Sequence, residues 1–291
     1  MPALPHLANA VVSGILTGTV YGLMALGLSA IFGVIRVVNF AHGELMTLAM
    51  YAAVVAFQGF ALDPFLTMIA AAAVFAAFGY ALQRGFINRF VHRPEHTQML
   101  LMIALAMILG NALLLGFGPD ARNVPTSYQL DSFELGPLLF DKVRVYAAGA
   151  ALLATALLAA FFRLTLTGKA IRACADNPVG ARVAGLPVAH LYAVTFAIGA
   201  ASVAVAGCAM APIIDVTPGL GPSYTLLAFV IVIVGGLGSM VGALLGGVVI
   251  GVSEALAGLL IAPSAKSMAS FGLLVLLLLA RPQGLMGGSR R

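Results

Sequence analysis

Long apolar runs separated by short polar segments fill almost the whole chain. Nine runs can be read from the sequence, at residues 8–35, 41–57, 63–82, 97–117, 144–162, 188–212, 223–236, 240–262 and 267–280. Several of them reach the roughly 20 apolar residues that a helix needs to cross a bilayer. The runs are continuous and do not alternate residue by residue, which disfavours a spanning β-barrel. The pattern therefore predicts an all-α polytopic membrane protein with eight to nine transmembrane helices.

Three of these runs, 41–57, 223–236 and 267–280, are short for full spans. We expect them to be tilted, broken or partly re-entrant, which a membrane protein tolerates where protein or water shields the backbone. Composition agrees with a membrane protein, since 62% of the residues are hydrophobic and only 9% are charged, against about 25% charged in soluble domains. We expect one transmembrane domain over residues 1–291.

Basic residues are distributed unevenly between the two sides of the predicted bundle. With the N-terminus outside, only Arg122, Lys142, Arg144 and Lys266 of the 15 lysines and arginines lie in outside segments. The positive-inside rule favours this orientation, with the C-terminus in the cytoplasm. The first run lacks a basic flank before Arg36 and is too long for a signal peptide, so we expect it to be retained as a span. The outside loop 118–143 is either a solvated connector or a contact surface for an external partner, and the sequence leaves both open.

The segment 163–187 leaves the membrane between two apolar runs and carries four bases against the single acid Asp176. Asn177 followed by Pro178 is typical of a helix start, with asparagine as the N-cap and proline at the first position. Gly185 suits the end of that helix. We therefore expect two short helices with a break between Asp176 and Asn177. The apolar side is formed by small residues, which suits a groove in another protein better than the lipid interface, although an amphipathic helix lying on anionic lipid is the alternative.

Polar residues at membrane depth form the second candidate site. Asn39 is a plausible N-cap for the run 41–57, which places His42 and Glu44 in its first helical turn. These two side chains are costly inside a membrane unless they are used. Either they cap and stabilise a helix start, or a short helix begins inside the protein and directs its end at the translocation path.

Glu254 stands near the middle of the run 240–262 and is the third candidate. Gly247, Gly251 and Glu254 share one side of a helix, so Glu254 is expected to point into the protein. It is either a structural acid bonded to a neighbouring helix or a polar group beside the path. Glycines at four-residue spacing, Gly14, Gly18 and Gly22 in the first run with Gly247 and Gly251, predict close packing of helices.

Three sequence motifs, in register over nearly the whole chain, resemble a known family. They are Asn39-Phe-Ala-His-Gly-Glu-Leu45, Arg172-Ala-Cys-Ala-Asp-Asn-Pro-Val-Gly-Ala181 followed by Gly185-Leu186, and Gly235-Gly-Leu-Gly-Ser239 with the glycines after it. Together they resemble the Liv-type (LivH-like) permeases of branched-chain amino acid ABC importers.

The resemblance implies a multi-pass permease subunit of the bacterial inner membrane that forms half of a pathway for branched-chain or related amino acids. It implies a second Liv-type permease, two cytoplasmic ATPases and an external substrate-binding protein as partners, with lipid around the spans. The ATPases would dock on Arg172, Ala173, Cys174, Ala175, Asp176, Asn177, Gly180, Ala181 and Gly185. Asn39, His42, Glu44 and Glu254 are the candidates for translocation or gating.

Several other classes of function lack the motifs they need. The sequence has no G-x-x-x-x-G-K-[ST], so ATP hydrolysis is expected on partner subunits and not on this chain. Cys174 and Cys208 suggest neither a disulfide framework nor a metal site, and we expect no cofactor, no catalytic residues and no nucleic-acid binding. The rival hypothesis is a secondary carrier or channel that acts without ATP, with Glu44 and Glu254 as proton or cation sites.

Overall fold

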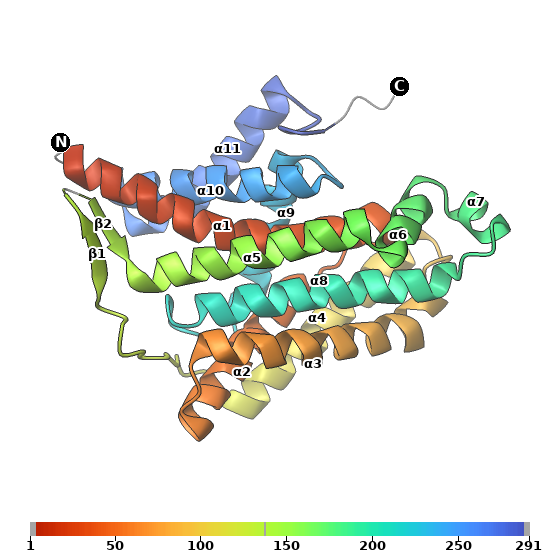
Figure 1. Cartoon of the computed structure of the whole chain (residues 1–291), viewed down its shortest axis with the longest axis horizontal. Helices are drawn as coiled ribbons and strands as arrows, with labels where there is room; N and C mark the ends of the chain where they lie inside the picture. Colours follow the sequence, from red (N-terminus) through yellow and green to blue (C-terminus); the bar gives the residue numbers. More distant parts are fainter. Residues whose placement is uncertain (1–3, 137, 288–291) are drawn as a thin grey trace.

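Helices make up most of the fold, which the computed structural model describes for residues 4–136 and 138–287 (Figure 1). In chain order the elements are α1 (Leu4–Ile35), α2 (His42–Phe60), α3 (Pro64–Gly85), η1 (Ile87–Arg89), α4 (Glu95–Phe117), β1 (Ser132–Leu135), β2 (Leu138–Asp141), α5 (Lys142–Leu164), α6 (Leu166–Asp176), α7 (Pro178–Val183), α8 (Val188–Met210), α9 (Leu220–Gly235), α10 (Met240–Leu260), η2 (Pro263–Ala265) and α11 (Lys266–Ala280).

Within these residues, 8 helices are long and apolar enough to cross a membrane, and α9 is a shorter apolar helix. The prediction of an all-α polytopic membrane protein is confirmed. Each of the nine predicted runs corresponds to one helix, with ends that differ by a few residues. Of the three runs that looked short, only α9 remains below the length of a span, because α2 and the η2–α11 segment extend beyond the apolar positions that predicted them.

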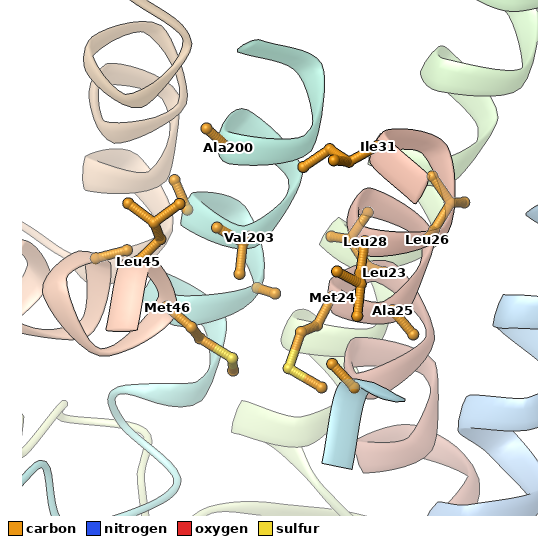
Figure 2. Close-up of a cluster of buried hydrophobic side chains, with 14 of the residues drawn as sticks. Leu23, Met24, Ala25, Leu26, Leu28, Ile31, Leu45, Met46, Ala200 and Val203 are labelled. Carbon is orange, nitrogen blue, oxygen red and sulfur yellow. The ribbon is translucent and has the colours of Figure 1, made fainter. Parts of the chain in front are cut away.

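The core forms where α1, α2 and α8 meet. Figure 2 shows Leu23, Met24 and Leu28 of α1 facing the side chains of α2 and α8 across this cluster. The helices α1 and α8 are largely buried within the chain, whereas α4 and α11 keep most of their surface exposed. The apolar residues of a membrane helix can face lipid, so burial here marks the elements that hold the bundle together.

A seam of small residues joins α1 to α10. Gly14, Gly18 and Gly22 of α1 lie against Gly247 and Gly251 of α10, and a Cβ added at any of the five would overlap backbone of the opposite helix. Backbones can approach this closely only where both helices lack side chains at the contact. The four-residue spacing seen in the sequence therefore corresponds to one continuous stripe along each helix.

The connection from α4 to α5 contains a short antiparallel ribbon that the sequence analysis did not anticipate. Ser132 pairs with Asp141 and Leu135 with Leu138 across β1 and β2. Asn9 of α1 accepts a hydrogen bond from the backbone of Leu139, and Arg122 forms a bridge with Val216. Figure 1 shows the ribbon at the same end of the molecule as the N-terminus.

The segment 163–187 folds into α6 and α7 with the predicted break between them. The Asn177 side chain accepts a hydrogen bond from Gly180 N at 2.9 Å, and Pro178 occupies the first helical position. Gly185 has a φ of 83°, and the bonds from Gly185 N to Arg182 O and from Leu186 N to Ala181 O complete a Schellman motif. Figure 1 shows both helices at the end of the bundle opposite to the ribbon.

The segment after α11 returns to the end of α9. Leu285 N donates to Val234 O at 2.8 Å and Met286 N donates to Gly235 O at 3.0 Å. These two carbonyls belong to the last turn of α9, where the helix has no further backbone N–H groups to donate to them. The chain following α11 thus supplies the cap of a different helix.

Candidate functional site

An open cavity of about 570 Å³ lies between α2, α4 and α9. Its walls are mostly apolar, and its polar side chains are Glu44, Asn111 and Thr225. The lining comprises Phe40, Glu44, Ile103, Ala106, Met107, Gly110, Asn111, Leu114, Pro218, Gly219, Pro222, Thr225 and Leu226. Apolar walls with a few polar groups are typical of sites for small molecules.

The cavity exists because α2 begins inside the bundle and not at its surface. His42 Nε2 lies 2.9 Å from Met24 O, in the middle of α1. At a rise of about 1.5 Å per residue, Met24 is about 16 Å along α1 from its last residue, Ile35. Residues 36–41 therefore return along α1 before α2 starts. This geometry agrees with a helix that begins inside the protein, although α2 itself is a continuous helix of 19 residues and not a short one.

Asn39 is not the N-cap of α2, and this prediction was wrong. Ala41 occupies the N-cap position, and its backbone N–H donates to Asn39 Oδ1 at 3.1 Å. Asparagine readily bonds the backbone two residues on and so forms a turn of its own. That turn occupies Asn39 to Ala41 and delays the helix start to His42. His42 and Glu44 still lie in the first turn, as predicted.

The starts of α2 and α9 are fastened together. Thr225 Oγ1 accepts a hydrogen bond from Gly43 N at 2.9 Å and donates to Phe40 O at 3.2 Å. A Cβ at Gly43 would overlap Gly221 O, so only glycine permits this approach. Two helix N-termini consequently meet at one place within the membrane, and both carry partial positive charge.

Glu44 faces the cavity from this junction. The residue is only 5% exposed, and a Cβ at Gly221 would overlap its carboxylate, while one at Gly110 would lie 3.3 Å from both oxygens. In the part of the chain that the structure describes, Glu44 Oε2 has no hydrogen-bond partner. At the centre of a transmembrane helix an acidic side chain costs about 3 kcal/mol. Glu44 lies in the first turn of α2, where the neighbouring helix N-termini offset part of the cost of its charge.

His42 points to the opposite side of α2 from Glu44. It is fully buried and lies against the backbone of α1, and it does not line the cavity. The structure thus separates two neighbours in the sequence: His42 anchors the helix start to α1, and Glu44 faces the cavity.

Comparison with known proteins identifies the family. Residues 10–279 match the family described as the permease component of branched-chain amino acid transport systems. The chain belongs to this family.

Individual relatives agree with this assignment. The permease is 30% identical over 300 residues to the high-affinity branched-chain amino acid transport system permease protein BraD of Pseudomonas aeruginosa, which covers 99% of this chain and 98% of BraD. It is 30% identical over 291 residues to LivH of Escherichia coli, covering 94% of each chain. A probable LivH of Methanocaldococcus jannaschii is 26% identical over 247 residues, or 80% of this chain and 76% of that protein. The resemblance predicted from the three motifs is confirmed, and nothing in the comparisons supports a secondary carrier.

Glu254 lies apart from the cavity of the permease. It belongs to α10, and its Oε1 accepts a hydrogen bond from Ser270 Oγ of α11 at 2.6 Å. Of the four candidates for translocation or gating, only Glu44 lines the cavity directly, while Asn39 and His42 shape the helix start beside it. The geometry of Glu254 favours the structural interpretation, in which a hydroxyl on the next helix satisfies the acid.

The α6–α7 element of the permease presents a mixed surface. Arg172, Ala173, Asp176, Asn177, Gly180 and Gly185 are exposed, Ala175 is half-buried, and Cys174 and Ala181 are buried. Two apolar side chains of α7 are also exposed, Val179 at 71% and Val183 at 85%. Burial raises the pKa of the Cys174 thiol, which keeps it protonated and poorly reactive.

The α4 and α9 walls of the cavity were missed by the sequence analysis. Gly110 and Asn111 sit in a long apolar run and give no periodic signal that separates a cavity-facing side from a lipid-facing side. The start of α9 could have been found, because Pro218-Gly-Leu-Gly-Pro222 has the proline of a first helical turn. Among the described residues, no three His, Cys, Asp or Glu side chains gather in a way that could hold a metal ion.

Proposed function

We propose that this permease forms half of the translocation pathway of an ABC importer for branched-chain amino acids, in one transmembrane domain of the bacterial inner membrane. The observation that carries the proposal is the cavity between α2, α4 and α9. Its apolar walls suit an aliphatic side chain, and its buried carboxylate suits the charged end of an amino acid. The names of BraD and LivH, which specify branched-chain amino acid transport, support this substrate class.

A second Liv-type permease completes the pathway in this proposal. The helix α4 forms one wall of the cavity, yet most of its surface is exposed within the single chain. Leu100, Ile108 and Leu115 are each more than half exposed. A partner permease against α4 and α9 would close the open side of the cavity and cover these side chains, as small and apolar contacts do between membrane helices.

Two cytoplasmic ATPases dock on the α6–α7 element and supply ATP hydrolysis. The exposed pair Val179 and Val183 with the neighbouring bases suits a groove in a partner protein. Arg172, Asp176 and Arg182 provide charges around that apolar patch. Because α6 follows α5 directly and α7 leads into α8, a movement of the docked ATPases would reach two spans, and α8 packs in the core beside α2.

The N-terminus faces outside, and the α6–α7 element and the C-terminus face the cytoplasm. The unequal distribution of bases supports this orientation. The loop 118–143 with its ribbon then faces the external substrate-binding protein. Tyr128 in this loop donates a hydrogen bond to Asp63 Oδ2 at 2.6 Å, and burial together with that carboxylate raises the pKa of the tyrosine. The loop is thereby held against the start of α3.

Purification of the tagged permease from its own membranes tests this function. We expect two ATPases and a second permease in the complex, and ATP-dependent uptake of radiolabelled leucine once the complex is reconstituted with the binding protein. A chain that is purified alone and takes up leucine along a proton or sodium gradient, with no requirement for ATP, would contradict the proposal and restore the carrier hypothesis.

A further inference from the structure

The Glu44 carboxylate lacks the partners that a buried acid normally has. At 5% exposure it is removed from bulk solvent, and in the described residues its Oε2 accepts no hydrogen bond. The ion pairs of those residues, Lys142–Asp131 and Arg144–Asp141, lie around the β1–β2 ribbon and not at the cavity. Buried carboxylates are usually paired or hydrogen-bonded. This one instead borders a cavity large enough for a small molecule.

The surroundings of Glu44 leave one direction of approach. The backbone of α9 at Gly221 and that of α4 at Gly110 stand against the carboxylate, so α9 and α4 close two of its sides. Thr225 is already engaged with Phe40 O and Gly43 N, and Asn111 Nδ2 donates to Met107 O within its own helix. A ligand that binds Glu44 must therefore enter from the cavity and bring its own hydrogen-bond donors.

The rest of the cavity is apolar. Its α4 wall is formed by Ile103, Ala106, Met107 and Leu114, and Leu226 of α9 faces the same space. Ca²⁺ and Mg²⁺ take six or more oxygen ligands in proteins, and this lining offers few. A ligand with a positive charge at one end and an aliphatic group at the other matches both halves of the site.

We propose that Glu44 binds the ammonium group of the amino acid during its passage through the permease, while the α4 wall contacts its aliphatic side chain. The inference rests on the proposed function and adds a specific contact to it. A primary ammonium has three donors and no acceptor, and it forms charge-assisted hydrogen bonds with a carboxylate. A single charged contact with an otherwise apolar site also lets the substrate leave again, which transport requires.

The test measures whether leucine protects a cysteine placed in the cavity. Both native cysteines are buried, so they are retained, and the reporter is Met107→Cys on the α4 wall, whose labelling is followed at residue 107. The purified complex is treated with N-ethylmaleimide, without binding protein, in the presence of L-leucine or 2-hydroxy-4-methylpentanoate. The hydroxy acid has the same carbon skeleton, with a hydroxyl group in place of the ammonium.

We expect leucine to slow labelling about fivefold when its concentration is about four times the dissociation constant, because bound sites react only after release. The hydroxy acid should protect little. In Glu44→Gln, which keeps the shape and removes the charge, leucine protection should be lost. In Glu44→Asp, which keeps the charge on a shorter side chain, protection should be weaker but still selective for the ammonium compound. The matched control is Glu254→Gln, which changes the other acid within a span. Leucine should protect the reporter cysteine in this variant as well as it does in the parent.

Equal protection by leucine and the hydroxy acid, or full leucine protection in Glu44→Gln, would overturn the inference. So would the absence of protection in a parent complex that still takes up leucine with ATP, an outcome that leaves the proposed function intact. A parent complex with no ATP-dependent leucine uptake would overturn the proposed function, and this contact with it.

Discussion

Two regions of the permease each place one glutamate at membrane depth, and they treat it differently. Where α10 packs on α1, glycines bring the two helices into direct contact, and Glu254 of α10 accepts a hydrogen bond from Ser270 of α11. Between α2, α4 and α9, glycines stand around the Glu44 carboxylate, and the cavity remains open beside it. The protein thus supplies a hydrogen-bond donor to Glu254, whereas we propose that the substrate supplies the donors to Glu44.

The difference depends on what each glycine faces. In the α1–α10 seam, glycine faces glycine, so the two backbones close on each other. At Gly110 and Gly221 the glycine faces a carboxylate, so the missing side chain makes room for the acid and not for a second helix. Glycine therefore allows close helix packing where it faces another glycine, and it leaves room for a buried carboxylate where it faces Glu44.

A large side chain placed in the glycine seam between α1 and α10 should have the largest effect on stability. Gly247→Leu places a side chain into the backbone of Gly22 and Gly18, and we expect a loss of at least about 3 kcal/mol of stability, the upper range for overpacking. The variant should fail to accumulate in membranes, as measured by quantitative immunoblotting. Gly272→Leu is the control, since a Cβ at that position meets nothing within 4 Å. Equal amounts of the two variants would contradict the close packing described here.

A side chain added beside Glu44 should strongly reduce transport while the complex still assembles. A Cβ in Gly221→Ala overlaps the Glu44 carboxylate, and displacement of that group costs about 1–3 kcal/mol, so leucine uptake should fall about tenfold or more. Uptake by the reconstituted complex is the measurement, with co-purification of partners as the check on assembly. Gly116→Ala on α4, where an added Cβ meets nothing within 4 Å and which does not line the cavity, should behave like the parent.

A third change should weaken ATPase binding, and with it transport, while the α1–α10 seam and the cavity stay intact. Val183→Asp puts a charge on the exposed apolar surface of α7. We expect the ATPases to bind about tenfold more weakly, since a buried contact at an interface contributes about 1–2 kcal/mol or more. Retention of the ATPases during purification is the measurement. Unchanged retention would show that the docking surface lies elsewhere, and Leu166→Asp on exposed α6 would then be the next variant.

The smallest effect should come from Ser270→Ala, which takes the hydroxyl from Glu254. Loss of one partner of a buried acid costs about 1–3 kcal/mol. The thermal midpoint of the purified permease should fall by several degrees, while leucine uptake per assembled complex should change less than twofold. A large loss of uptake without loss of stability would place Glu254 in the transport cycle and undo the contrast between the two acids.

Much of the fold could be predicted, because its signals are local. Each apolar run became a helix, and Asn177, Pro178 and Gly185 marked the limits of α7 since capping depends on residues a few positions apart. The glycine spacing in α1 and α10 indicated a packed stripe because the period of a helix converts it into one face.

The cavity could not be predicted, because it is a product of long-range contacts. The side of α4 that faces Glu44 depends on where α9 begins. The start of α9 is in turn held by the hydrogen bond between Thr225 and Gly43, which are 182 residues apart in the sequence. The Asn39 cap failed for a related reason: its side chain had two local uses, and the turn to Ala41 prevailed. The β1–β2 ribbon has strands of 4 residues each, too short for a periodic signal.

The bonds from Leu285 and Met286 to the end of α9 have a consequence for biosynthesis. The ribosome makes α9 well before these residues, so the last carbonyls of that helix lack their partners until Leu285 and Met286 have been translated. An engineered truncation before Leu285 would leave the carbonyls of Val234 and Gly235 without donors for good. A purification tag should therefore be placed beyond Met286 and should not replace Leu285 and Met286.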